Sequence, residues 1–156
     1  MDNKKAISSI HTLLETCRDG KNGYQTAAEN VKNPQVRAEL QKFAAQREEF
    51  IQELESTALK YGESAKNETT VAGLAMDAAG AVHRGWINLK AAVSSHDSKA
   101  VLNECENGDQ AALKTYESVM EEDIPSEIKN VVQRQHDQIE AAVNKIESIK
   151  RSWIRD

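Results

Sequence analysis

The chain has 156 residues, of which 29% are charged and 39% hydrophobic, and its formal net charge is −5. No apolar run approaches the roughly 18 residues of a membrane span, and the mild acidic excess argues against general binding to nucleic acid. The amino-terminal stretch lacks the apolar core of a signal peptide, so we expect a cytoplasmic protein with no membrane partner. Two prolines, seven glycines and few aromatic residues favour helices over strands.

Apolar residues recur every three or four positions along the first part of the chain, which predicts two long helices. The first is expected over 4–32. It contains Gly20 and Gly23, so we expect a kink, a break or a close approach to another element there. An Asn-Pro pair follows, which suits a cap and a first helical turn. The second helix is expected over 34–61, with Gly62 in the position of a carboxy-terminal cap.

The second part of the chain predicts three more helices. The stretch 71–94 is helical in pattern and dense in alanine and glycine, so it should lie tightly against its neighbours. Asp97 is placed to cap a helix over 98–121. The last helix begins near Pro125 and carries apolar residues at heptad spacing as far as Trp153, as in a helical bundle.

A faint internal repeat relates the two ends of the chain. When Val36 is laid on Ile128, Leu40 falls on Val132, and the same register continues along both helices. We therefore predict an all-α fold, an up-down four-helix bundle made of two helical hairpins, with an extra helix in the crossover between them. Residues 1–156 are expected to form a single domain.

Charged residues interrupt the apolar stripes. Arg47 lies on the stripe of the second helix, and Asp109 lies on that of the fourth, with Glu106 one turn earlier. A buried unpaired charge costs several kcal/mol, so Arg47 should meet Glu106 or Asp109 in the interior, and the hydroxyls of Tyr24 and Tyr116 could join them. The alternatives are that Arg47 extends to the bundle edge, or that these groups form a metal or catalytic site.

A metal site can be compared with known ligand patterns. A di-iron carboxylate bundle uses a Glu from each of two helices and a Glu-x-x-His from each of the other two. Here the fifth helix has Gln133 three residues before His136, and the other helices lack the histidine, so the set is incomplete. A single ion held by Glu106, Asp109 and His136 is the remaining metal hypothesis.

The stretch 83-HRGW-86, with Lys90 one turn later, concentrates unusual residues in two turns. Trp86 continues the apolar stripe, and Gly85 leaves room beside it for another backbone, which indicates a packing motif. Alternatively, His83, Arg84 and Lys90 line an anion or partner site. Catalysis by His83 is a third interpretation, although no partner nucleophile is visible.

Four segments together resemble a bacterial PA2169-type family of four-helix-bundle proteins, a domain of unknown function in the ferritin-like superfamily. The segments are 23-GYQTAAE-29, 46-QREEFIQEL-54, 83-HRGW-86 with Lys90, and 104-ECENGDQAALKTY-116. The resemblance covers nearly the whole chain and implies a ferritin-like bundle, but it carries no established activity. Looser relatives in that superfamily bind metals, and this chain departs from their ligand pattern.

Three functional hypotheses follow. The first is a non-enzymatic stress-associated or interaction protein, which could form a homo-oligomer through an apolar edge of the last helix near Trp153. The second is a protein that binds iron or manganese. The third is a binder of a small ligand or anion through Arg47 or the cations around Trp86. Cys17 and Cys105 lie on apolar faces and are expected to be buried, reduced thiols.

Overall fold

The computed structural model describes residues 3–62 and 85–152, and every regular element within those ranges is a helix. The elements in chain order are α1 (Asn3–Glu29), α2 (Pro34–Leu59), α4 (Leu89–Ser94), α5 (Ser98–Met120) and α6 (Ser126–Ser152). The predicted all-α bundle is confirmed. No helix in the described part of the chain is both long and apolar enough to cross a membrane.

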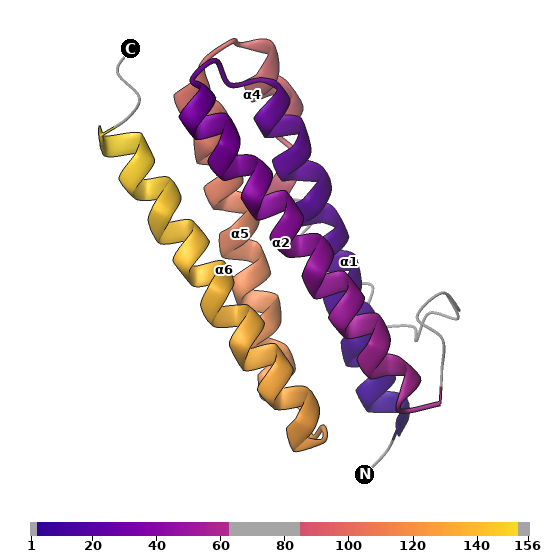
Figure 1. Ribbon diagram of the computed structural model, residues 1–156. Coiled ribbons are helices and arrows are strands. Elements are labelled where there is room, and N and C mark those ends of the chain that lie inside the picture. The colour runs from indigo at the N-terminus through magenta and orange to yellow at the C-terminus, as the bar shows by residue number, and fades with distance from the viewer. Residues whose placement is uncertain (1–2, 63–84, 153–156) are drawn as a thin grey trace.

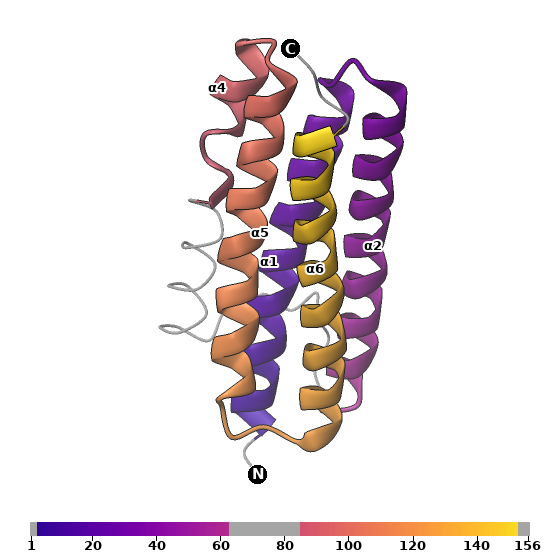
Figure 2. The same cartoon turned by 90° about the vertical axis from the view of Figure 1, so that its left-hand side faces the viewer.

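The four long helices form two antiparallel hairpins, α1 with α2 and α5 with α6 (Figure 1). The hairpins pack side by side, so that α1 contacts α5 and α2 contacts α6 (Figure 2). The second helix ends at the opposite end of the bundle from the start of α5, so one long crossover joins the hairpins. The short helix α4 lies in that crossover and packs on α5 and α1. A single long crossover is the connectivity of ferritin-like bundles.

Local signals place the helix ends close to their predicted positions. The side chain of Asn33 accepts hydrogen bonds from the backbone N–H groups of Gln35 and Val36, at 2.8 and 3.2 Å, and so caps α2. Asp97 caps α5 in the same way through Lys99. Gly62 has a φ of 86°, a left-handed conformation that glycine adopts without strain, just beyond the end of α2.

Two predictions concern glycine-rich parts of the chain, namely α1 around Gly20 and the helix expected over 71–94. α1 is continuous through Gly20 and Gly23, and both glycines mark close approaches rather than a break. The helix predicted over 71–94 falls largely outside the described residues. Its described part is not one helix, because a turn at residues 87–88 separates Trp86 from α4. The turn redirects the chain after Trp86 has entered the space between α1 and α5.

The core divides into two apolar clusters. One is built from the first half of α1, the second halves of α2 and α5, and the first half of α6. The other joins the second half of α1, the first half of α2, the start of α5 and the second half of α6 to Trp86 and Leu89. The apolar residues of α6, from Ile128 to Ile149, are buried in these clusters. Within 126–152 this helix therefore leaves no free apolar edge, and Trp153 lies outside the described residues.

Candidate functional site

A buried ion pair joins the two hairpins. Arg47 on α2 donates two parallel hydrogen bonds to Asp109 on α5, with Nη1–Oδ1 at 2.7 Å and Nη2–Oδ2 at 3.0 Å. The two side chains are 1% and 0% exposed, so Arg47 does not extend to the bundle edge. Such a bidentate pair combines charge with fixed geometry, which a buried pair needs to offset the cost of desolvation.

Tyr24 on α1 completes this cluster. Its hydroxyl donates to Oδ2 of Asp109, and the Arg47 guanidinium lies over its ring, 5.2 Å from the centroid. Gly20 makes space for the cation, because a Cβ there would lie 2.9 Å from Nη1 of Arg47. Burial, together with the charge of Asp109, raises the pKa of Tyr24 well above 10.0. Burial alone would lower the pKa of Arg47, but Asp109 reverses this and raises it.

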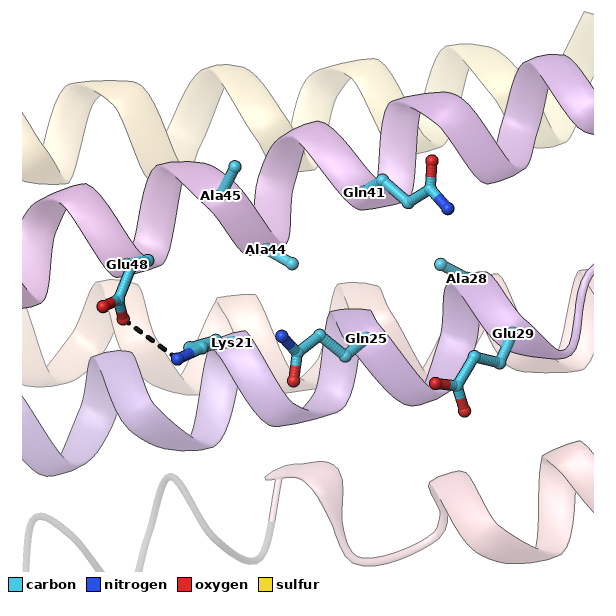
Figure 3. Close-up of a pocket in the computed structure, with 8 residues that line it drawn as sticks. All are labelled: Lys21, Gln25, Ala28, Glu29, Gln41, Ala44, Ala45 and Glu48. Carbon is cyan, nitrogen blue, oxygen red and sulfur yellow. Dashed lines mark hydrogen bonds and ion pairs between the residues drawn. The ribbon is translucent and has the colours of Figure 1, made fainter.

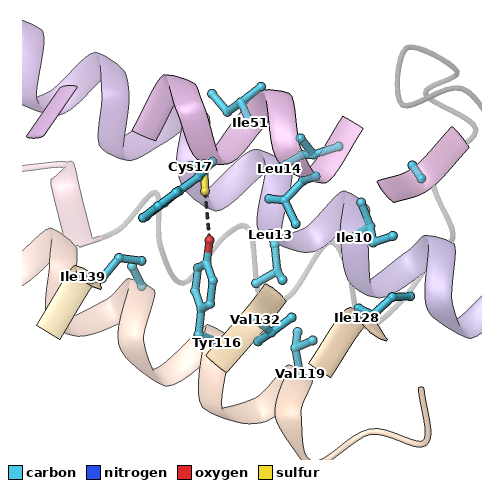
Figure 4. Close-up of a cluster of buried hydrophobic side chains, with 14 of the residues drawn as sticks. Ile10, Leu13, Leu14, Cys17, Ile51, Tyr116, Val119, Ile128, Val132 and Ile139 are labelled. Atoms are coloured by element: carbon cyan, nitrogen blue, oxygen red, sulfur yellow. Dashed lines mark hydrogen bonds between the residues drawn. The ribbon is translucent and has the colours of Figure 1, made fainter. Parts of the chain in front are cut away.

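A second buried polar chain runs through the other cluster. The Tyr116 hydroxyl donates to Oε1 of Gln135 at 2.7 Å. Its oxygen is left to accept from the Cys17 thiol, 3.0 Å away (Figure 4). The amide of Gln135 donates in turn to Glu53 at 2.8 Å. Burial raises the pKa of Cys17 to about 11, and burial likewise raises that of Cys105 well above 9.0. Both thiols are therefore protonated at neutral pH and are weak nucleophiles.

The three residues of the single-ion hypothesis are not brought together. Asp109 is engaged by Arg47, whereas Glu106 lies 2.8 Å from the ammonium of Lys150. His136 contacts Glu117 across the α5–α6 interface at 2.9 Å. Within 3–62 and 85–152 no group of three or more His, Cys, Asp or Glu side chains is placed to hold a metal ion. Binding of iron or manganese stays a prediction.

The crossover motif around Trp86 packs tightly onto the bundle. The indole lies between α1 and α5, where a Cβ on either Gly23 or Gly108 would collide with its ring. It contacts the Tyr24 ring edge-on, with centroids 5.2 Å apart. Gly85 approaches the α5 backbone so closely that a Cβ would lie 3.2 Å from a carbonyl oxygen. Lys90 is exposed, and His83 and Arg84 lie outside the described residues.

Two surface grooves flank α1. One, of about 500 Å³, lies between α1 and residues 85–93. Trp86, Ile87, Leu89 and Val93 give it an apolar wall, Lys90 adds a cation, and the α1 wall is polar. The other, of about 520 Å³, lies between α1 and α2 (Figure 3). It is lined by alanines and by polar side chains, and an ion pair between Lys21 and Glu48 crosses one end.

The sequence matches the domain of unknown function DUF2383 over residues 5–123. The chain belongs to this family. The predicted membership in a family of unknown function is thus confirmed. No curated protein matches the chain. The DUF2383 match contains Tyr24, Arg47, Asp109 and Trp86, so the ion pair and the Trp86 contact both lie inside the family region. It ends before α6, and Gln135 lies outside it.

Sequence reasoning placed Tyr24, Arg47, Glu106, Asp109 and Tyr116 of this DUF2383 protein in one polar network. The structure brings Tyr24, Arg47 and Asp109 together. Glu106 instead contacts Lys150, and Tyr116 lies in the separate chain through Cys17 and Gln135, which was not predicted. The available signal was the place of Cys17 and Gln135 on apolar stripes. A polar atom at such a position is buried, and burial is tolerable only when the atom has a hydrogen-bond partner. The role of Gly108 was also missed. A glycine inside a long helix indicates a close approach, but not which side chain approaches.

Proposed function

We propose that this protein is a non-enzymatic interaction protein that self-associates through the groove between α1 and residues 85–93. The observation that carries the proposal is the apolar wall of that groove. Its rim residue Ile87 is 60% exposed, one of two large hydrophobic side chains in the described part of the chain to be so exposed. Apolar surface of this kind, bordered by polar residues, is typical of a protein–protein contact.

The interior supports a non-enzymatic role. Both oxygens of Asp109 are occupied by Arg47 and Tyr24, and all three groups are buried. The Cys17 thiol is buried, and its raised pKa keeps it protonated. A catalytic acid, base or nucleophile must reach its substrate, and these groups are enclosed and committed to one another. Their arrangement suits a structural connection between the hairpins.

A second copy of the chain is the occupant that the groove suits best. In a two-fold dimer the same patch faces itself, so an apolar wall on one copy meets an apolar wall on the other. The last helix, from which self-association was first expected, has its apolar residues inside the monomer over 126–152. The groove between α1 and the crossover offers the apolar surface that α6 does not.

Light scattering over a range of concentrations tests this proposal. The wild-type protein should show a concentration-dependent mass, and Ile87→Asp should weaken self-association by at least about tenfold, because it places a charge in an apolar contact. Leu59→Asp is the matched control, since Leu59 is 64% exposed and lies outside the groove. A monomer at every concentration, or equal effects of the two variants, would contradict the proposal.

A further inference from the structure

The largest side chain that the crossover residues 85–94 bury against the bundle is the indole of Trp86. The ring is seated in a slot that exists because Gly23 on α1 and Gly108 on α5 carry no side chain. The ring also contacts Tyr24 edge-on. A large ring in so close-fitting a space makes many van der Waals contacts with both helices.

The rest of the segment is lightly held. α4 has six residues, and only Leu89 and Ala92 of them are buried. Its amino terminus lacks a side-chain cap, and Ile87 and Lys90 are exposed. The helices within each hairpin, and α1 with α5, contact one another far more extensively than α4 contacts its neighbours α5 and α1. Short elements with few buried contacts are the ones that open locally in native proteins.

The two cysteines lie in different apolar clusters, and only one of these clusters contains residues of this segment. Cys105 is one helical turn before Gly108 on α5 and belongs to the same apolar cluster as Trp86 and Leu89. Cys17 belongs to the other cluster, where its thiol contacts Tyr116. Both thiols are buried, and neither forms a disulfide bond. Access to Cys105 therefore reports on the Trp86 cluster, and access to Cys17 reports on the rest of the bundle.

We propose that residues 85–94 form a latch, which opens as a unit while the four long helices stay folded. Withdrawal of Trp86 bares the slot between Gly23 and Gly108 and uncovers the Cys105 side of α5. It also removes the cover from Tyr24, whose hydroxyl holds Asp109. The latch thus controls access from solvent to the buried ion pair. This inference does not depend on self-association.

Thiol labelling of the native wild-type protein tests the latch. The protein is incubated with a maleimide, and the two cysteine-containing peptides are quantified by mass spectrometry. Cys105 should be labelled at least about 100-fold faster than Cys17, with a rate that hardly changes in low urea, because a local opening exposes little surface. Equal rates for the two thiols, both rising steeply with urea, would show that only global unfolding exposes Cys105 and would overturn the proposal.

Two variants separate local from global opening. Ile10→Val weakens the cluster that excludes the latch, so it should speed labelling of Cys17 by roughly 2- to 10-fold and leave Cys105 unchanged. Trp86→Phe should speed labelling of Cys105 by roughly tenfold, because the smaller ring fills the slot less well. If Ile10→Val accelerates both thiols equally, the latch does not open on its own.

Discussion

The two buried tyrosines occupy equivalent places in the two hairpins but bind different partners. Tyr116 follows Tyr24 by 92 residues, and Asp109 follows Cys17 by the same 92, which is also the offset between Val36 and Ile128 in the sequence repeat. Tyr24 on α1 donates to Asp109 on α5, and Tyr116 on α5 contacts Cys17 on α1. The same geometry therefore holds a carboxylate on one side and a thiol on the other.

The positions next to Asp109 on one side and Cys17 on the other differ as well. Arg47 corresponds to Ile139, and Gly20, which makes space for the guanidinium, corresponds to Ala112. Both Ile139 and Ala112 are buried in the apolar cluster. One side thus has the Arg47 cation, the Asp109 carboxylate and the glycine that makes space for the cation. The other side has three uncharged residues at the corresponding positions. The residues of the charged side therefore form a coordinated set and are more than a single polar substitution.

The largest expected effect comes from removing one member of the charged set. Asp109→Ala leaves the Arg47 guanidinium buried without its partner, which should lower the free energy of unfolding by about 3–5 kcal/mol. Urea unfolding at neutral pH measures this. The triple variant Gly20→Ala, Arg47→Ile, Asp109→Cys copies the uncharged side and should regain most of that loss. A triple variant less stable than Asp109→Ala would show that the two sides are not interchangeable.

The tyrosine hydroxyls allow a direct comparison of the two sides. Tyr24→Phe removes a hydrogen bond to a buried carboxylate and should cost about 1.5–3 kcal/mol. Tyr116→Phe removes bonds between uncharged groups and should cost about 1 kcal/mol. Both costs are read from urea unfolding curves with the wild type as reference. Equal losses would mean that the charge of Asp109 adds nothing to its bond with Tyr24.

The smallest expected effect concerns pH. Burial alone would lower the pKa of His136, but hydrogen bonds to Glu117 and Asp137 raise it above 6.5. The stabilisation from protonated His136 is therefore complete below pH 6.5 and is lost as the pH rises through the folded-state pKa.

Both acids are largely exposed, so screening by solvent keeps this contribution small. The difference in unfolding free energy between wild type and His136→Gln should be larger at pH 6 than at pH 9. A difference that grows with pH would contradict the assignment.

The helices and caps were predictable because they depend on local chemistry. Asn33, Asp97 and Gly62 each act within a few residues of their own position, so their signals are complete in the sequence. The place of Arg47 on an apolar stripe suggested an interior ion pair but left open an extended position at the bundle edge, and only packing decides between the two. The choice of Asp109 over Glu106 was also open, because both acids lie near the α5 stripe and only packing shows that Glu106 is turned toward Lys150.

The contacts of the crossover could not be derived in the same way. The sequence indicated that Trp86 packs against the bundle, but its slot is made by Gly23 and Gly108 from two other helices. The turn at residues 87–88 was also unexpected, since the apolar period continues through it. Both features are set by long-range packing, which overrides a local helical pattern.

The long crossover also has a consequence for the order of folding. α1 and α2 are joined by four residues, 30–33, and α5 and α6 by five, 121–125, so each hairpin can form from contacts that are close in sequence. Arg47 and Asp109 are 62 residues apart and belong to different hairpins. Each charge can therefore stay hydrated while its own hairpin forms. Water needs to leave the ion pair only when the hairpins dock, which makes Arg47 and Asp109 a late contact on the folding pathway.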